Sequence, residues 1–160
     1  MAVDFLWYNP KYNSYKTDNQ KADSMKIDVN YIKQILEILE SIDSPTMYSK
    51  DLYDKMHEIA PSNDNDGKFI KHIWDLRDLG AIESNNCDMG FRQGANGDWV
   101  MNGCFYRLTV RGQQLLDVMR NDTWWNRIKS SGKEITVELL KQAPSIIIDA
   151  LQTDTAKPQR

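Results

Sequence analysis

A helical arrangement of cationic and hydrogen-bonding side chains marks the segment from Lys68 to Leu79. The polar residues on one side of a helical wheel are Lys68, Lys71, His72 and Asp75, and the opposite side is apolar. In DNA-binding domains such a helix lies in the major groove, where donors on its solvent face contact base edges and phosphates. The segment is therefore a candidate DNA-reading helix with Lys68, Lys71 and His72 as contacts. A solvated helix face is an equally good interpretation.

Further candidate contacts lie in a glycine-rich stretch after that helix. Arg92, Gln93 and Asn96 fall near the tip of a predicted hairpin, where they are expected to reach phosphates or bases, although Gln and Asn are also ordinary turn residues. The charge balance is unfavourable, because residues 66–111 hold six basic and six acidic side chains and sum to zero. Since phosphate neutralisation supplies most non-specific affinity, the sequence predicts weak binding to double-stranded DNA with a shallow salt dependence.

Aromatic side chains form a second set of candidates, for contact with another protein. Those near the start of the chain are Trp7, Tyr8, Tyr12 and Tyr15, in a segment without helical or alternating period. Trp124 and Trp125 are adjacent, and neighbours on a helix point about 100° apart, so the two cannot both face one core. We expect one of them to be exposed or covered by a partner, and the early aromatic segment either to fold back on its own domain or to contact a partner chain.

Catalytic and metal-binding patterns are missing from the sequence. The candidate metal ligands are Cys87, Cys104, His57 and His72, without a Cys-x-x-Cys or His-x-x-x-His pair. No phosphate-binding loop, Gly-x-Ser-x-Gly or His-Glu-x-x-His motif occurs. We therefore expect a protein that is not an enzyme and that uses no metal or cofactor, with both cysteines reduced.

The elements that would position these side chains follow from apolar periodicity and from helix-ending residues. Helices are predicted over 28–42, from an N-cap at Ser49 to Pro61, over 68–79, over 111–121, from residue 122 or 123, and from Thr136 to Leu151. A hairpin is predicted over 81–109. A four-residue loop at its tip would place Cys87 opposite Cys104, and a tighter turn would place Cys87 opposite Tyr106. Three short helices followed by a hairpin and further helices give the order of a winged helix-turn-helix domain; a helical bundle with an added hairpin is the rival.

Several segments resemble a known family. Residues 108–117 read Leu-Thr-Val-Arg-Gly-Gln-Gln-Leu-Leu-Asp, residues 120–126 read Arg-Asn-Asp-Thr-Trp-Trp-Asn, and residues 79–82 read Leu-Gly-Ala-Ile. Together with the start at 25–28, they are similar to an uncharacterised family of small bacterial and phage proteins, number 2513 among the domains of unknown function. The resemblance covers about residues 25–143 and implies a winged-helix fold, while residues 1–24 depart from it. It implies no biochemical role.

The 160-residue chain has the composition of a globular protein, with 27% charged residues and a net charge of −3. We expect a mainly α fold with a β-hairpin (α+β), made of an N-terminal aromatic arm (1–24), a winged-helix domain with C-terminal helices (25–151) and a polar tail (152–160). Without an apolar run of membrane length or a signal peptide, we expect a cytoplasmic protein. The sequence leaves two functions open. One is a DNA-binding regulator that acts as a homodimer, and the other is a winged-helix scaffold that recognises a protein, for example a phage or mobile-element factor that docks on a host or defence protein.

Overall fold

The computed structural model describes residues 26–130, 132 and 134–143. Its helices and strands are α1 (Val29–Ser41), β1 (Met47–Tyr48), α2 (Ser49–Ile59), α3 (Asn65–Asp78), β2 (Ile82–Ser84), β3 (Phe91–Gln93), β4 (Trp99–Met101), β5 (Phe105–Leu108), α4 (Val110–Arg120) and α5 (Asp122–Ser130). A further helical segment covers residues 137–143. The predicted α+β class is confirmed, and the order of the elements is that of a winged-helix-like fold. The predicted arm and polar tail lie outside the described residues.

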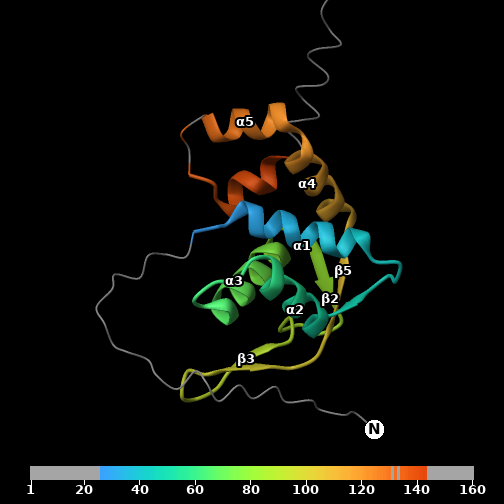
Figure 1. Cartoon of the computed structure of the whole chain (residues 1–160), viewed down its shortest axis with the longest axis vertical. Coiled ribbons are helices and arrows are strands. Elements are labelled where there is room, and N and C mark those ends of the chain that lie inside the picture. Colours follow the sequence, from blue (N-terminus) through green and yellow to red (C-terminus); the bar gives the residue numbers. More distant parts are fainter. Residues whose placement is uncertain (1–25, 131, 133, 144–160) are drawn as a thin grey trace, which may run out of the picture.

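Helix α1 lies at the centre of the molecule. Its buried residues Ile32, Ile35, Leu36 and Leu39 follow the spacing that predicted the helix. Asp28 is its N-cap, and the carboxylate accepts a hydrogen bond from the backbone N–H of Tyr31 at 3.1 Å. In Figure 1 the C-terminal helices α4 and α5 lie on one side of α1, and α2, α3 and the hairpin lie on the other.

Helix α2 begins without the predicted serine cap. The N-cap position belongs to Tyr48, which makes no side-chain capping bond, because strand β1 runs directly into the helix. The hydroxyl of Ser49 accepts instead from the backbone N–H of Cys104 at 3.2 Å, and the N–H of Ser49 donates to the carbonyl of Cys104 at 2.8 Å. Ser49 therefore ties the start of α2 to the strand that follows the hairpin.

Helix α3 begins three residues earlier than predicted. Asp64 occupies its N-cap and accepts from the backbone N–H of Gly67 at 3.0 Å, so the polar turn contributes the first helical turn. The chain leaves the helix at Gly80, the predicted end, where a φ of +68° favours glycine. Phe69, Ile70, Ile73 and Leu76 are buried, which confirms the predicted apolar face.

The predicted hairpin contains two ladders with different registers. Strand β5 lies between β1 and β2 in a three-stranded antiparallel sheet, in which Ile82 faces Leu108. Strands β3 and β4 form a separate two-stranded sheet, in which Phe91 faces Met101. Both predicted partners of Cys87 are wrong, because a turn over residues 86–89 takes that residue out of the ladders and leaves it exposed.

The turn between the two ladders is held from inside the core. Met89 has a φ of +59°, which is uncommon for a residue with a side chain. Its carbonyl accepts from the buried hydroxyl of Tyr106 at 2.7 Å and from the thiol of Cys104 at 3.3 Å. Strands β3 and β4 and the turn between them are called the outer hairpin here. The bonds to Met89 fix the point at which this outer hairpin leaves the three-stranded sheet.

The C-terminal helices pack on α1. Arg120 at the end of α4 makes two hydrogen bonds to the carboxylate of Glu40 on α1, at 2.6 and 3.0 Å. These bonds lower the pKa of Glu40, since they favour its charged form. Thr136 accepts from the N–H of Leu139 at 3.2 Å, as expected for the start of the last helix. The predicted continuation of that helix to Leu151 lies outside the described residues.

Candidate recognition surface

His72 does not lie on the solvent face of α3, and its predicted role as a DNA contact is wrong. Its side chain is fully buried, because the N-terminus of α1 packs over it. Ring atom Nε2 accepts the backbone N–H of Asp28 at 2.9 Å, and Nδ1 lies 2.7 Å from the carbonyl of Lys68 and donates to it. Burial lowers the pKa of His72, since it disfavours the charged ring. The residue therefore joins α1 to α3.

Lys68 and Lys71 remain partly exposed on α3, but each is bonded to a carboxylate. The ammonium of Lys68 is 2.8 Å from Asp28 and lies 4.7 Å from the centre of the Tyr31 ring. Lys71 pairs with Asp75 one helical turn further on. Partial burial raises the pKa of Asp28, but the bonds from Lys68 and from the N–H of Tyr31 outweigh it and hold the pKa below its usual value. Much of the positive charge predicted for a reading helix is thus matched within the domain.

The predicted hairpin contacts lie at the outer end of the domain, as expected. The side chain of Arg92 is 72% exposed and lies 3.3 Å from the carboxylate of Asp88. Gln93 is exposed and donates to the carbonyl of Gly97 at 3.2 Å, and Asn96 bonds to its near neighbour Asp98. All three make their bonds within the hairpin and remain accessible to a partner.

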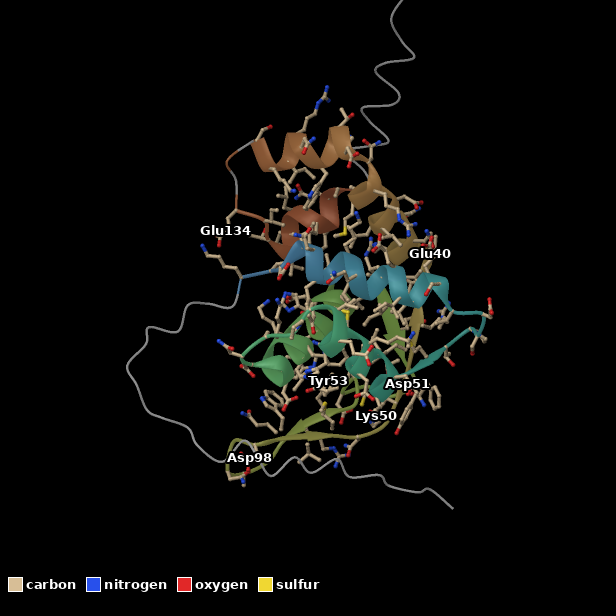
Figure 2. The ribbon with its side chains drawn as sticks, viewed as in Figure 1. Glu40, Lys50, Asp51, Tyr53, Asp98 and Glu134 are labelled. Carbon is tan, nitrogen blue, oxygen red and sulfur yellow. The ribbon has the colours of Figure 1, made fainter. Side chains whose placement is uncertain are left out.

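The charge of this half of the domain is negative. The segment that comprises α2, α3 and the hairpin (residues 49–103) holds six Lys and Arg residues and ten Asp and Glu residues, a net charge of −4. The labelled residue Asp98 lies at its outer end, on the hairpin, in Figure 2. This count differs from the sum of zero over 66–111 for two reasons: residues 49–65 add a net charge of −2, and Arg107 and Arg111, which follow the outer strands, are left out. The segment that would supply the DNA-facing elements in a winged-helix protein therefore carries more acidic than basic residues.

Aromatic side chains line the contact between α3 and the outer hairpin. Trp74 of α3 and Trp99 of β4 are partly exposed, and their rings meet edge to face at 5.3 Å. Phe69 contacts Phe91 of β3 at 6.0 Å in the same orientation. Sequence reasoning missed this contact, although its signal is present: strand β4 reads Trp-Val-Met, an apolar run where a DNA-binding wing would carry polar residues.

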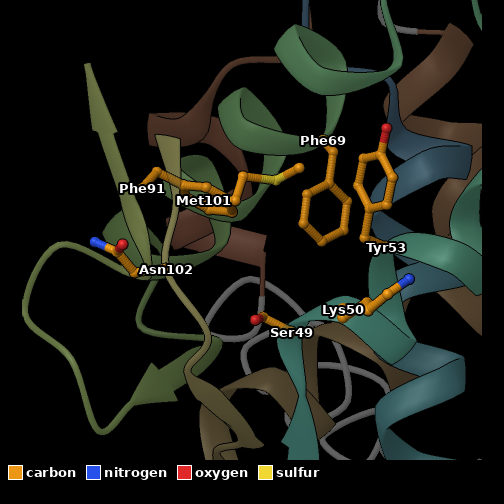
Figure 3. Close-up of a pocket in the computed structure, with 7 residues that line it drawn as sticks. All are labelled: Ser49, Lys50, Tyr53, Phe69, Phe91, Met101 and Asn102. Atoms are coloured by element: carbon orange, nitrogen blue, oxygen red, sulfur yellow. The ribbon is translucent and has the colours of Figure 1, made fainter. Parts of the chain in front are cut away.

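A shallow groove opens beside this aromatic contact. It is lined by Ser49, Lys50, Tyr53, Phe69, Phe91, Met101 and Asn102 (Figure 3), and the empty space of about 260 Å³ beside these residues includes open solvent. The Met101 side chain points toward the ring of Phe69, beside which Tyr53 stands. The hydroxyl of Tyr53 donates to Asp66 at 2.6 Å, and the ammonium of Lys50 donates to Asp54 at 2.6 Å.

The predicted tryptophan pair belongs to the C-terminal part of the core. Trp125 is buried, and Trp124 is partly buried and packs against the same cluster. Lys129 lies 5.4 Å from the centre of the Trp125 ring. The two side chains therefore differ in burial, as their spacing predicts, and the less buried Trp124 still contacts the domain. The other predicted interaction residues, Trp7, Tyr8, Tyr12 and Tyr15, lie outside the described residues.

The described ranges hold neither a metal-ligand cluster nor a helix of membrane-spanning character. In these ranges no group of three or more His, Cys, Asp or Glu side chains is arranged to hold a metal ion. None of the helices in the same ranges combines the length and apolar character needed to cross a bilayer.

One family matches most of the chain. A family model described as a hypothetical protein (DUF2513) matches residues 26–138, close to the range over which the sequence resembles that family. No curated protein matches the chain. No solved structure matches it either. Since the match covers well over half of the 160 residues, the chain belongs to the DUF2513 family.

Proposed function

We propose that this chain is a non-enzymatic winged-helix module that recognises another protein through α2, α3 and the outer hairpin. The observation that carries the proposal is the net charge of −4 over residues 49–103. A surface of that sign repels the phosphate backbone, which otherwise supplies most non-specific affinity for nucleic acid.

The hydrogen bonds of α3 support the same conclusion. Lys68 is bonded to Asp28, Lys71 is bonded to Asp75, and His72 is buried. Exposed ion pairs are weak, so phosphate could replace a carboxylate partner, but the freed carboxylate would then stand beside the phosphate and repel it. The partly exposed Trp74, Trp99 and Met101 on the same side of the domain suit a protein partner, because aromatic residues and methionine are enriched at protein interfaces.

DNA binding by a regulator is the second candidate function. It is favoured by the position of α3 after a helix and a turn, and by the exposed Arg92 at the hairpin. In that case α3 would enter the major groove and the hairpin would follow the backbone.

Fluorescence anisotropy of the full chain with a labelled mixed-sequence duplex, over a series of salt concentrations, distinguishes the two functions. We expect no saturable binding even at low salt. A log-log salt slope steeper than about −2, reduced by Lys71→Ala, would replace the protein-recognition proposal with DNA binding, because each lost phosphate contact removes about one unit of slope. Lys55→Ala on α2 is the matched control, since it removes one exposed lysine outside α3.

A further inference from the structure

We propose that the contact between the first turn of α1 (residues 28–31) and helix α3 opens in mild acid, when His72 takes up a proton, while the rest of α1 stays packed. The inference follows from the groups that surround the His72 ring and from the different ways in which the two ends of α1 are held. It does not depend on the proposed function.

The hydrogen bonds of His72 fit a neutral ring. Atom Nε2 accepts the backbone N–H of Asp28 at 2.9 Å, so the ring proton lies on Nδ1, which donates to the carbonyl of Lys68 at 2.7 Å. A proton added at Nε2 would point one N–H donor at another and break the bond to Asp28. The bond to Lys68 lies within α3 and survives. Protonation therefore acts on the link between the two helices.

The charged groups around the ring are already paired with one another. The titratable and charged residues that face the ring are Asp28 and Tyr31 of α1, and Lys68, Lys71 and Asp75 of α3. The carboxylate of Asp28 is bonded to Lys68, and that of Asp75 is bonded to Lys71. Burial of the ring outweighs the attraction of these carboxylates, so the pKa of His72 lies below its ordinary value. A charged ring is therefore favoured where it reaches solvent.

The last turn of α1 is held by contacts that do not titrate in mild acid. Glu40 is bonded to Arg120 of α4 at 2.6 Å, and this bond lowers the pKa of Glu40, so the carboxylate stays charged. Leu36 and Leu39 are buried in the core beside it. Because apolar contacts are independent of pH, this part of α1 keeps its place when the first turn is released.

The first turn of α1 is held closed at neutral pH by burial as well as by the His72 bond. Val29 and Tyr31 are 9% and 4% exposed, and their exposure to water on opening is unfavourable. Opening would also separate Lys68 from Asp28. The face of α3 would then gain two positive charges in acid, one on the unpaired Lys68 and one on His72.

Hydrogen exchange of the full chain at pH 7.5 and pH 5.5 tests the inference, with each amide corrected for its intrinsic rate. The amides to follow are those of Asp28, Tyr31 and Ile32, which are hydrogen-bonded at the start of α1. An exposed imidazole has a pKa of about 6.5, so we expect these amides to exchange about five- to tenfold faster at pH 5.5. A change of less than twofold would overturn the inference.

Urea distinguishes local release from unfolding of the whole domain. Low concentrations of urea accelerate exchange steeply only where the opening exposes much surface. At pH 5.5 the amides at the start of α1 should exchange at nearly the same rate with and without urea, whereas the amide of Leu116 in α4 should depend on it steeply. An equally steep dependence at both places would overturn the local opening and would leave a pH-dependent global stability intact.

Two histidine variants assign the effect to one ring. His72→Phe should abolish the pH dependence of exchange at Tyr31 and Ile32, and His57→Phe on exposed α2 should preserve it. A pH dependence that persists in His72→Phe would overturn the assignment. If that variant fails to fold by circular dichroism, NMR titration of the His72 ring in the unaltered chain decides. Its midpoint should coincide with that of the exchange at Tyr31, and a ring that stays neutral while exchange accelerates would overturn the inference.

Discussion

The backbone N–H of Asp28 donates a hydrogen bond to the ring nitrogen Nε2 of His72, 2.9 Å away and 44 residues later in the chain. This bond requires a neutral imidazole, because a protonated ring has no acceptor. The other ring nitrogen is held by the carbonyl of Lys68, so the tautomer is fixed. Asp28 is also the N-cap of α1, and the same contact therefore places the start of α1 on α3.

Stability should fall in mild acid because of His72. Burial lowers its pKa in the folded protein below the ordinary value of 6.5, so the unfolded chain binds the proton more readily. The stabilisation that neutral His72 contributes is fully present above about pH 6.5. It is lost as the pH falls toward the lower pKa of His72 in the folded protein. Urea denaturation across this pH range measures the slope. His72→Phe should remove the slope and cost about 1–3 kcal/mol at neutral pH, because the Asp28 N–H loses its partner. An unchanged slope in this variant would contradict the assignment, and His57→Phe on exposed α2 is the control.

A second loss of stability should occur at lower pH because of Asp28. Although partial burial raises the pKa of Asp28, its bonds, mainly the one from Lys68, hold that pKa below the ordinary value of 3.8. The charged carboxylate therefore stabilises the folded protein above about pH 4, and this stabilisation is lost as the pH falls further. Lys68→Met should raise the Asp28 pKa, read from the NMR shift of its carboxyl carbon, and should cost about 0–1 kcal/mol, since the pair is partly exposed. Lys71→Met should leave the Asp28 shift in place. An equal rise in both variants would refute the local ion pair as its cause.

Gly112 should tolerate no side chain. A Cβ at this position in α4 would overlap the backbone carbonyl of Ala81, which has no room to move because it accepts a hydrogen bond from Thr109. Gly112→Ala is expected to cost about 3 kcal/mol or more in the free energy of unfolding. Gly97→Ala is the comparison: it has a φ of +86° and open space, so only backbone strain of about 1–2 kcal/mol applies. If the two variants unfold at the same denaturant concentration, the close approach of residue 112 to the carbonyl of Ala81 does not determine the loss of stability.

Removal of the Tyr106 hydroxyl should loosen the outer hairpin more than the sheet. In Tyr106→Phe the carbonyl of Met89 keeps only the weaker thiol donor of Cys104, so the loss should be about 1 kcal/mol. Hydrogen exchange should accelerate at the amides of β3 and β4 and stay slow in β5. Uniform acceleration across both ladders would indicate that the hydroxyl stabilises the whole domain instead.

The elements could be predicted wherever one local pattern decided the structure. The spacing of Ile32, Ile35, Leu36 and Leu39 predicted α1, and Gly80 marked the end of α3, because apolar periodicity and backbone sterics act over a few residues. The order of elements followed from these segments and indicated the winged-helix-like arrangement. The starts of helices were predicted less accurately, because several residues before α3 are of types that cap helices.

The site could not be predicted where distant segments compete for one side chain. Ser49 has the residue type of an N-cap, but its hydroxyl bonds to Cys104, 55 residues away. His72 follows the polar face of α3 on a helical wheel, yet the N-terminus of α1 covers it. A wheel describes one helix in isolation and contains no information on which of its sides another element covers. The groove was missed for the same reason, since its walls come from α2, α3 and two strands.

The change of register beside Met89 makes the outer hairpin a separable insert. Residue numbers of facing partners sum to 190 in the ladder of β2 and β5 and to 192 in the ladder of β3 and β4, so the outer pairing is not a continuation of the inner one. A change of length or composition between Phe91 and Met101 would therefore leave the pairing register of β2 and β5 unaltered. The tip of the outer hairpin can therefore vary while the three-stranded sheet of β1, β5 and β2 keeps its pairing.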